Sequence, residues 1–558
     1  MNEKRFFEEL IETIKSKKLK KDDLSKFKQA LCKKYKIREV PTDIQILTHA
    51  DKKDLRILKK YLKTKPVRTM SGVAVVAIMA KPSKCPHGKC IYCPGGPSSV
   101  FGDVPQSYTG KEPATMRALR AKFDPYVQVF SRLEQYIVTG HNPDKAELIV
   151  MGGTFPSLPK KYQESFVACA FKAMNDFSAM FYKKNNFDFD RFREFFELPG
   201  SVWDKKRAKS LISKIKVLKN KNIKNLEYEQ NRNEKSSIRC VGLTIETRAD
   251  YATEKECREM LKLGCTRVEL GVQSVYDSVL KKAERGHSVK TTIDAFKTLK
   301  DFGFKINAHY MIGLPGSDAK MDAEGLRKLF YDEKFRPDML KIYPCLVLKG
   351  TKLYGWWKNR KYAELTAERA AEIISEFKKF VPEYCRIMRI QRDIPSNAVA
   401  AGPIMTNLRQ YVESVMKEKG IKCRCIRCRE IKNRKIESPE LKIIEYPASG
   451  GGEFFISCEE GDKLIGFCRL RFPPNNEKIA FVRELHVYGP AEKIGEEGEV
   501  QHRGFGSKLL KKAEEIARKN RKKKILVISG VGVREYYRNL GYRKEGNYMV
   551  KNFSLGTE

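Results

Sequence analysis

Short apolar runs alternate with helix-like stretches between about residue 71 and residue 400, and this alternation constrains the fold more than any other feature. Repeated pairs of a β-rich run and a helical pattern are typical of parallel sheets, because the crossover between parallel strands is usually a helix. The predicted strands are 73–79, 146–151, 241–246, 267–272, 305–312 and 339–343, with helices such as 255–263 and 291–302 between them. Such a sheet is open or closed into a barrel, and its ligands bind at the carboxyl ends of the strands.

The rest of the chain divides into further regions, because 558 residues suggest three or four domains at roughly 150 residues each. Residues 1–70 predict basic helices, with 21 Lys/Arg against 10 Asp/Glu, and residues 71–400 predict the βα region. Residues about 180–236 interrupt that region and are interpreted as a surface insertion. Residues 401–440 predict a basic, cysteine-containing linker, and 441–558 predict a separate small α/β domain.

The net charge of +41 indicates a polyanionic partner, with nucleic acid first and an anionic membrane surface second. The alternative is a Lys-rich solvated surface without a partner. No apolar run approaches the roughly 20 residues that cross a bilayer, and the charged start lacks the apolar stretch of a signal peptide. We therefore expect a cytoplasmic protein without a membrane partner, whose 15 cysteines serve metal binding, catalysis or burial rather than disulfides.

Three closely spaced cysteines carry the first chemical signal. Cys85, Cys90 and Cys93 form a C-x4-C-x2-C run in KPSKCPHGKCIYCPGGP. Three thiolates on one loop can hold three irons of a [4Fe–4S] cluster and leave the fourth iron open to a substrate or cofactor. The alternative is a zinc loop, which requires a fourth ligand at suitable spacing.

The cysteine run resembles the radical S-adenosylmethionine enzymes, and its flanks resemble the catalytic subunit of the Elongator complex, a tRNA-modifying enzyme, with the compact spacing of prokaryotic members. The resemblance implies a radical S-adenosylmethionine partial (β/α) barrel and a cluster on the three cysteines. It also implies that S-adenosylmethionine, bound to the open iron, yields a 5′-deoxyadenosyl radical.

Residues after the predicted strands agree with such a cofactor. Glycines allow close backbone approach, and carboxylate, amide and arginine groups suit ribose hydroxyls and a carboxylate. The expected S-adenosylmethionine contacts are Gly152, Gly153, Thr154, Glu246, Arg267, Glu269 and Gln273. For the charged members, a salt bridge inside the barrel is an equal alternative. By the resemblance, Lys341 and Tyr343 point into the barrel mouth as catalytic residues.

A glycine-rich turn before a helix carries the second signal, because backbone N–H groups at a helix N-terminus bind pyrophosphate. The order of strand, turn and helix resembles the GNAT acetyltransferase fold, which implies acetyl-CoA as a substrate. The expected contacts are Glu484, Leu485, His486, Val487, Gln501, Arg503, Gly504, Phe505, Gly506 and Ser507. Tyr537 would lie near the thioester sulfur, where a phenol can donate a proton. Core packing is the alternative for Tyr536 and Tyr537, and the Elongator resemblance adds Lys145 as an acetyl-CoA contact.

Cys423, Cys425 and Cys428 form a C-x-C-x2-C run in the linker. Three thiols on a short turn suit zinc, with His486, Cys458 or Cys468 as a candidate fourth ligand, and free thiols are the alternative. Together with residues 1–70, this basic linker could frame a groove for the anticodon stem-loop of tRNA.

The two halves together imply acetyl-CoA-dependent carboxymethylation at C5 of the wobble uridine, position 34, of tRNA. A protein lysine acetyltransferase with a structural cluster, and a catalytically quiet tRNA-binding scaffold, are the alternatives. The sequence leaves open whether the enzyme forms a homodimer or needs Elongator-like accessory subunits.

Overall fold

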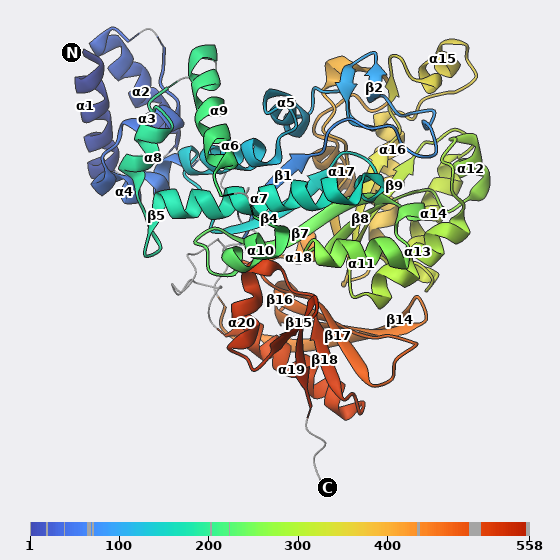
Figure 1. Cartoon of the computed structure of the whole chain (residues 1–558). Coiled ribbons are helices and arrows are strands. Elements are labelled where there is room, and N and C mark those ends of the chain that lie inside the picture. Colours follow the sequence, from blue (N-terminus) through green and yellow to red (C-terminus); the bar gives the residue numbers. More distant parts are fainter. Residues whose placement is uncertain are drawn as a thin grey trace.

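The structure is a computed structural model that describes residues 2–17, 21–37, 39–63, 69, 72–200, 204–222, 224–431, 436–489 and 504–553. Among the described residues, no helix is long and apolar enough to cross a membrane. Figure 1 shows a helical N-terminal region, a central sheet wrapped by helices, and a C-terminal unit on the far side of that sheet.

The central sheet has seven strands in the order β1-β4-β7-β8-β9-β10-β12, and each neighbouring pair is parallel. The strands are β1 (Ala74–Met79), β4 (Lys145–Met151), β7 (Arg239–Arg248), β8 (Arg267–Gln273), β9 (Lys305–Ile312), β10 (Met339–Pro344) and β12 (Arg386–Arg389). The six predicted strands are confirmed to within two residues. The seventh, β12, was not predicted, because four residues are too short to show a period.

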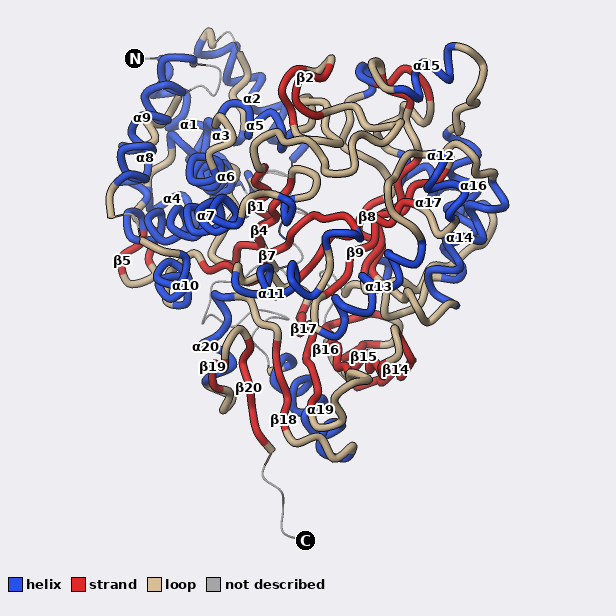
Figure 2. Tube along the Cα trace, turned by 45° about the vertical axis from the view of Figure 1, so that its right-hand side comes forward, coloured by secondary structure: helices blue, strands red, loops and turns tan. Residues whose placement is uncertain are grey.

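Helices cover the outer face of this sheet, as the tube in Figure 2 shows. The helices of residues 113–181 and 254–429 are α5 (Pro113–Arg120), α6 (Pro125–Val138), α7 (Lys160–Phe181), α11 (Glu254–Lys262), α12 (Asp277–Lys282), α13 (Val289–Asp301), α14 (Ala319–Tyr331), α15 (Lys352–Lys358), α16 (Ala367–Phe377), α17 (Leu408–Glu418) and α18 (Ile426–Arg429). Short ribbons accompany them: β2 (Gly96–Ser99) with β3 (Gly102–Val104), and β11 (Val347–Leu348) with β13 (Val399–Ala401).

Four short helices precede the sheet: α1 (Asn2–Lys17), α2 (Lys21–Tyr35), α3 (Asp43–His49) and α4 (Lys52–Leu62). Their apolar faces are buried, with Phe6, Leu10 and Leu58 fully inaccessible, so their cationic faces remain on the outside. Thr42 starts α3 with a reciprocal capping box to Gln45, which satisfies free N–H groups of the first turn.

Residues 182–234, which include most of the predicted insertion, pack tightly against α7. They form the ribbon β5 (Tyr182–Lys183) with β6 (Asn186–Phe187), and the helices α8 (Phe189–Phe195), α9 (Lys205–Asn220) and α10 (Leu226–Glu234). Phe192 and Phe196 are fully buried and pack against Phe177 and Phe181 of α7 in edge-on and tilted ring contacts. This aromatic cluster gives the segment a core of its own.

The C-terminal unit is a mixed seven-stranded sheet in the order β14-β15-β16-β17-β18-β20-β19. Its elements are β14 (Glu440–Ala448), β15 (Gly451–Glu460), β16 (Lys463–Phe472), β17 (Ile479–Val487), α19 (Phe505–Lys519), β18 (Lys524–Val527), α20 (Arg534–Arg538), β19 (Arg543–Glu545) and β20 (Tyr548–Asn552). Only β17 and β18 are parallel, and they pair over Ile479–Val482 alone, so β17 leaves β18 beyond that point.

Arg483 of β17 is fully buried where the C-terminal unit meets the central sheet. Its guanidinium donates to both carboxylate oxygens of Asp338, at 2.5 and 2.9 Å, and to Glu453 at 2.9 and 3.1 Å. It also donates to the carbonyl of Phe304 at 2.7 Å. Asp338 precedes β10 and Phe304 precedes β9, so one side chain ties the amino ends of the sheet to the C-terminal unit.

Two further buried arginines on β16 extend the network. Arg469 donates to Glu484 at 2.8 Å, and Arg471 donates to Asp301 at 2.6 Å. Because the charges on both sides are desolvated, loss of one partner leaves the other unpaired in the interior. The network therefore fixes the position of the C-terminal unit under the sheet.

Replacement of Asp338 by Asn should lower the free energy of unfolding by about 3–5 kcal/mol at pH 7, because Arg483 loses its carboxylate. Burial opposes ionisation of Asp338, but Arg483, Lys300 and Arg469 hold its pKa well below the ordinary value. A depressed native pKa gives stability that is complete above the unfolded pKa of about 4 and is lost as pH falls through the native pKa. The difference between the variant and the natural protein should therefore shrink in acid, as measured by urea unfolding at pH 7 and pH 3.5.

Asp294→Asn is the matched control, because Asp294 pairs with Lys290 on the exposed face of α13. Such exposed pairs contribute about 0.3–0.5 kcal/mol. An equal and small effect of both substitutions would show that the buried network does not hold the unit in place.

Candidate functional site

A cavity of about 160 Å³ lies at the carboxyl ends of the sheet strands, below the cysteine loop. This carboxyl-end cavity is lined by Cys85, Cys90, Tyr92, Tyr108, Gly153, Thr154, Glu246, Glu269, Gln273, Arg285, His309, Lys341, Tyr343 and Arg389, among others. Most of the residues predicted for S-adenosylmethionine and for radical chemistry therefore meet in one place. Gly152 adjoins the cavity, since its N–H donates to Glu246 at 3.4 Å.

The three loop cysteines are held by donors that suit sulfur ligands of a cluster. Arg285 donates to the Cys90 Sγ at 3.6 Å, and the backbone N–H of Ser107 donates to the Cys93 Sγ at 3.2 Å. The Cys85 Sγ lies 3.8 Å from the Thr154 Oγ1. Among the described residues, one set of three potential metal-ligand atoms lies within 4.8 Å of one another, and it is formed by Cys423, Cys425 and Cys428 rather than by the loop cysteines. The loop sulfurs are thus too widely spaced for one ion, as expected for thiolates on separate irons.

Three residues at or beside the carboxyl-end cavity have a positive φ. Gly152 and Gly153 have φ of +130° and +92°, and a Cβ on Gly152 would lie 3.3 Å from Ala80. Gln273 at the end of β8 has φ of +70°, which is uncommon for a residue with a side chain and is found at ligand sites. Gly153 and Gln273 line the cavity, so these backbone conformations shape its wall.

Several buried polar atoms of this cavity have no hydrogen-bond partner among the described residues. They are the Tyr92 Oη, the Gln273 Oε1 and the Arg285 Nε. Buried polar groups are nearly always paired, so these atoms fit a polar ligand that completes the site. The residues present therefore fit a cluster with S-adenosylmethionine.

Glu246 and Glu269 lie on adjacent strands, and their surroundings shift their pKa values in opposite directions. Burial and the charge of Glu269 raise the pKa of Glu246 to about 7, and both its oxygens accept from the Tyr108 hydroxyl at 2.9 and 3.0 Å. Burial would also raise the pKa of Glu269, but the ion pair with Lys341 and the hydrogen bond with His309 hold it well below its ordinary value. Glu269 is therefore a fixed anion, whereas Glu246 titrates near neutral pH.

A second cavity, of about 580 Å³, lies between the amino ends of the sheet strands and the C-terminal unit. This amino-end cavity contains the described residues predicted for acetyl-CoA. They are Lys145, Glu484, Leu485, His486, Val487, Gly504, Phe505, Gly506, Ser507, Tyr536 and Tyr537. Gln501 and Arg503 lie outside the described residues.

The local structure explains how this cavity could hold a nucleotide thioester. Because β17 leaves β18 after Val482, no strand of the described residues pairs with the backbone from Glu484 onward on that side. A pantetheine arm can pair there as a strand would. Gly504 caps α19 at φ of +80°, and the N–H groups of the first turn suit a pyrophosphate.

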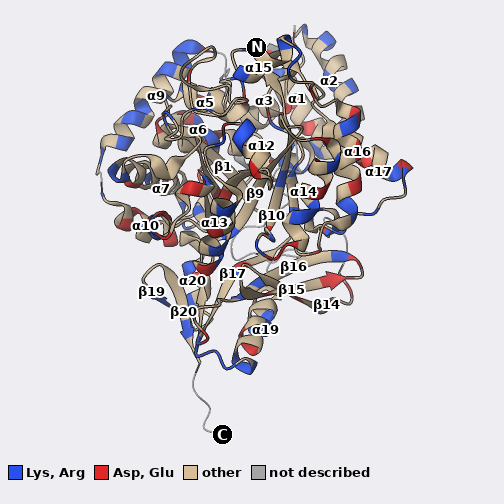
Figure 3. Cartoon of the chain, turned by 90° about the vertical axis from the view of Figure 1, so that its right-hand side faces the viewer, with Lys and Arg blue, Asp and Glu red and all other residues tan. Residues whose placement is uncertain are grey.

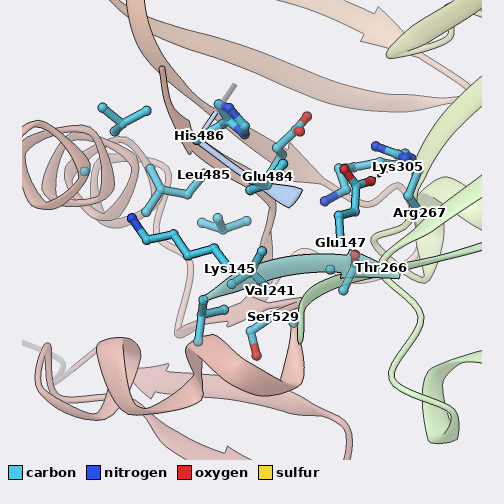
Figure 4. Close-up of a pocket in the computed structure, with 18 of the residues that line it drawn as sticks. Lys145, Glu147, Val241, Thr266, Arg267, Lys305, Glu484, Leu485, His486 and Ser529 are labelled. Atoms are coloured by element: carbon cyan, nitrogen blue, oxygen red, sulfur yellow. Dashed lines mark ion pairs between the residues drawn. The ribbon is translucent and has the colours of Figure 1, made fainter. Parts of the chain in front are cut away.

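The structure separates Arg267 from the other residues predicted for S-adenosylmethionine. Arg267 begins β8 and lines the amino-end cavity, where it pairs with Glu147. The prediction placed Arg267 with Glu269 and Gln273 at the carboxyl end of a strand, but Arg267 is the first residue of β8, and only Glu269 and Gln273 line the carboxyl-end cavity. Figure 4 shows Glu147, Arg267 and Lys305 gathered at one end of this cavity, while Lys145 extends toward the other end beside Leu485.

Several site residues were missed in the sequence. Glu147, Lys305, Tyr108 and Arg285 line the two cavities and were not predicted. The period of two along a strand could have found Glu147, which shares a face with Lys145. No local pattern could have found Tyr108 or Arg285, which lie in loops.

Known families match almost the whole chain. The ELP3 N-terminal domain matches residues 4–70, the Radical SAM superfamily 81–324, the Radical_SAM C-terminal domain 337–418 and the Acetyltransferase (GNAT) family 405–542. A tRNA uridine(34) acetyltransferase of Methanocaldococcus infernus is 45% identical, over 92% of this chain and 91% of that protein. The chain belongs to the Elongator complex protein 3 family.

Other members of the Elongator complex protein 3 family agree with this assignment. The human Elongator complex protein 3 is 38% identical, over 95% of this chain and 93% of that protein. A solved structure of the M. infernus protein, lacking its first 46 residues, superposes with a TM-score of 0.69 at 39% identity. It covers 87% of this chain and 100% of that one. The predicted fold, a radical S-adenosylmethionine partial barrel joined to a GNAT domain, is confirmed.

For this member of the family, the Radical SAM domain implies a [4Fe–4S] cluster with S-adenosylmethionine, and the GNAT domain implies acetyl-CoA. The carboxyl-end cavity lies in the first domain, and the amino-end cavity lies where the second meets it.

The second cysteine run forms a compact cluster between the two domains. The sulfurs of Cys423, Cys425 and Cys428 lie within 4.8 Å of one another, which suits a single metal ion. The candidates for a fourth ligand lie elsewhere: His486 lines the amino-end cavity, and Cys458 and Cys468 are buried in the GNAT sheet.

The affinity for S-adenosylmethionine should rise about tenfold from pH 6 to pH 8, if Glu246 accepts from the ribose hydroxyls as a carboxylate. Its pKa of about 7 means that Glu246 is mostly protonated at pH 6 and mostly ionised at pH 8. Glu246→Gln should bind weakly at both pH values. Equilibrium binding to the reconstituted protein measures the effect, with Asp393→Asn at the exposed rim as the control. A flat profile for the natural protein would exclude this role.

Proposed function

We propose that this protein is a tRNA-modifying enzyme that uses acetyl-CoA and radical S-adenosylmethionine chemistry to carboxymethylate C5 of uridine 34. The observation that carries the proposal is that two cavities suited to these two cofactors lie at opposite ends of one partial barrel. Relatives at 45% and 46% identity are named tRNA uridine(34) acetyltransferase. Because tRNA is the proposed substrate, we expect the enzyme to work in the cytoplasm.

At the carboxyl-end cavity, Cys85, Cys90 and Cys93 would hold the cluster. Together with S-adenosylmethionine, the cluster supplies a radical that removes a hydrogen atom from an unactivated carbon. Gly153 and Thr154 would lie along the cofactor, and Gln273 has the free amide oxygen to accept from it.

Lys341 and Tyr343 project from β10 into the same cavity. Burial and the charge of Lys341 lower the pKa of His309 to about 4, so this histidine is neutral at pH 7. Lys341 is therefore the cation nearest to Glu269. It can hold a uracil carbonyl or an acyl oxygen in place while the reacting carbon faces the radical.

Two tyrosines line the amino-end cavity, and they differ in burial: Tyr537 is buried and Tyr536 is exposed. Burial raises the pKa of Tyr537 far above its ordinary value, so its phenol is protonated at pH 7 and can donate to a leaving thiolate. Tyr536 is 40% exposed, and its hydroxyl lies 3.0 Å from the place of a Cβ on Gly506. Tyr536 thus bounds the first turn of α19, where the pyrophosphate would bind.

Basic surfaces support tRNA as the substrate. Lys and Arg are spread over the outer helices, including the N-terminal helices and α9 (Figure 3). The helix α9 carries seven Lys/Arg and no acidic residue. In Figure 3, α9 lies well apart from the helices α1 and α2, so they offer separate basic surfaces to a phosphate backbone. Such binding should weaken steeply with salt.

The decisive test uses cluster-loaded protein with tRNA, acetyl-CoA, S-adenosylmethionine and a reductant, followed by mass spectrometry of the nucleosides. A carboxymethyl group on uridine 34 is expected. Cys90→Ala should abolish it, because the cluster loses a ligand, whereas Cys169→Ala, on α7 away from both cavities, should leave it unchanged. Unmodified uridine with a loaded cluster and bound tRNA, together with acetylation of lysine-rich peptides, would instead support the protein acetyltransferase.

We further propose that Cys423, Cys425 and Cys428 hold zinc. The protein purified without added metal should carry about one zinc per chain. Cys425→Ser should release it, as measured by plasma mass spectrometry, and Cys169→Ser is the matched control. Equal zinc in both variants would favour free thiols at this position.

A further inference from the structure

The two cavities lie at the two ends of the partial barrel, and we call the interior of the barrel between them the lumen. Six strands each contribute residues to both cavities, from their amino ends to one and from their carboxyl ends to the other. On β8, for example, Arg267 lines the amino-end cavity, while Glu269, Gly271 and Gln273 line the carboxyl-end cavity. These positions alternate along the strand and so share its inner face.

A charged network closes the lumen between the cavities, and we call it the waist. Glu147 pairs with Arg267, whose guanidinium also lies 4.0 Å from Glu269. Glu269 accepts in turn from Asn307 at 3.2 Å and pairs with Lys341. The waist therefore runs from the wall of one cavity to the wall of the other through ionic contacts.

Polar atoms of the waist remain unsatisfied. Among the described residues, the buried Arg267 Nε and Asn307 Oδ1 have no hydrogen-bond partner. Asn307 is fully buried and lines neither cavity. A buried donor or acceptor without a partner destabilises the fold. The waist can therefore accept a hydrogen bond from, or donate one to, another polar group.

The proposed reaction needs the two cavities to communicate. Hydrogen abstraction requires contact between the acetyl methyl and the radical carbon, whereas the strands separate the two ends by several residues. From Arg267 to Gln273 the strand rises about 20 Å at roughly 3.3 Å per residue. A thioester along β17, with its pyrophosphate on the first turn of α19, would direct its acyl end away from Val487 and toward Glu147, Arg267 and Lys305, which border the waist.

We propose that the acetyl end of acetyl-CoA enters the carboxyl-end cavity through this lumen, and that Arg267 is the gate. The inference rests on the proposed function. Arg267 swings from its carboxylate partners and donates its unpaired Nε–H to the acyl carbonyl oxygen. No bond breaks in the passage. In the cavity beyond, one hydrogen atom moves from the acetyl methyl to the 5′ carbon, which yields 5′-deoxyadenosine.

Gly242 offers a way to block the waist without removal of a charge. A Cβ on this β7 residue would lie 3.6 Å from the Thr266 Oγ1 and 3.8 Å from the Glu147 Cγ, both ordinary contacts. Gly242→Leu therefore places branched carbon atoms at the amino-end mouth of the waist. Asn307→Met is a second blocking variant, inside the waist and outside both cavities. Gly452→Leu, on β15 with similar free space, is the control.

In the first measurement, acetyl-CoA that carries a trideuterated methyl group is added to the holoenzyme together with tRNA. The deuterium that appears in 5′-deoxyadenosine is then measured. Both blocking variants should lose transfer by about a hundredfold, the cost of misplaced reacting groups, while Gly452→Leu transfers normally. Normal transfer in both blocking variants would overturn the gate. Absence of transfer in the natural protein would instead refute the proposed function.

The second measurement needs neither radical chemistry nor tRNA turnover. Bromoacetyl-CoA is added to the full chain without its cluster, so that a thiolate of the cysteine loop can displace bromide and form a thioether. Peptide mass spectrometry should find label on Cys85, Cys90 or Cys93 in the natural protein, suppressed by excess CoA. Labelling should fall in both blocking variants, although iodoacetamide, which enters from solvent, labels all proteins equally. Equal bromoacetyl labelling in natural and blocked proteins would place the route outside the lumen.

Discussion

The buried pairing of Arg483 with Asp338 and Glu453 is the contact on which the rest of the structure depends. It joins the GNAT sheet to the amino ends of the barrel strands, in a setting from which water is excluded. Desolvated ion pairs contribute little net stability relative to apolar packing, but they tolerate only one arrangement. The amino-end cavity exists because this arrangement places β17 under the barrel.

This arrangement changes how a partial barrel is used. Parallel sheets normally bind ligands at their carboxyl ends and leave their amino ends to stability. Here the amino ends also line a cavity, since Lys145, Arg267 and Lys305 border the space shared with the GNAT domain. The ion pairs inside the barrel, from Glu147 to Glu269, then lie between the two cavities.

The two glutamates of the carboxyl-end cavity differ in their protonation at neutral pH. Glu269 is fixed as an anion by Lys341, while Glu246 on the next strand titrates near neutral pH because that anion is its neighbour. Two carboxylates on neighbouring strands thus acquire different roles from their surroundings alone. The loop cysteines lie at the same cavity, where Arg285 donates to Cys90 and the backbone N–H of Ser107 donates to Cys93.

The sequence by itself determined the order of elements, the cysteine loop and the glycine-rich turn, because hydrophobic period and motif spacing are local properties. It therefore predicted six barrel strands, and nearly all of the described residues that it named for the two cofactors line one of the two cavities. Only the tertiary structure decided that Arg267 lines the amino-end cavity, and that Glu147, Lys305 and Arg285 line the cavities as well. Those facts depend on which strand end meets which domain, and buried charge pairs distant in sequence set that geometry.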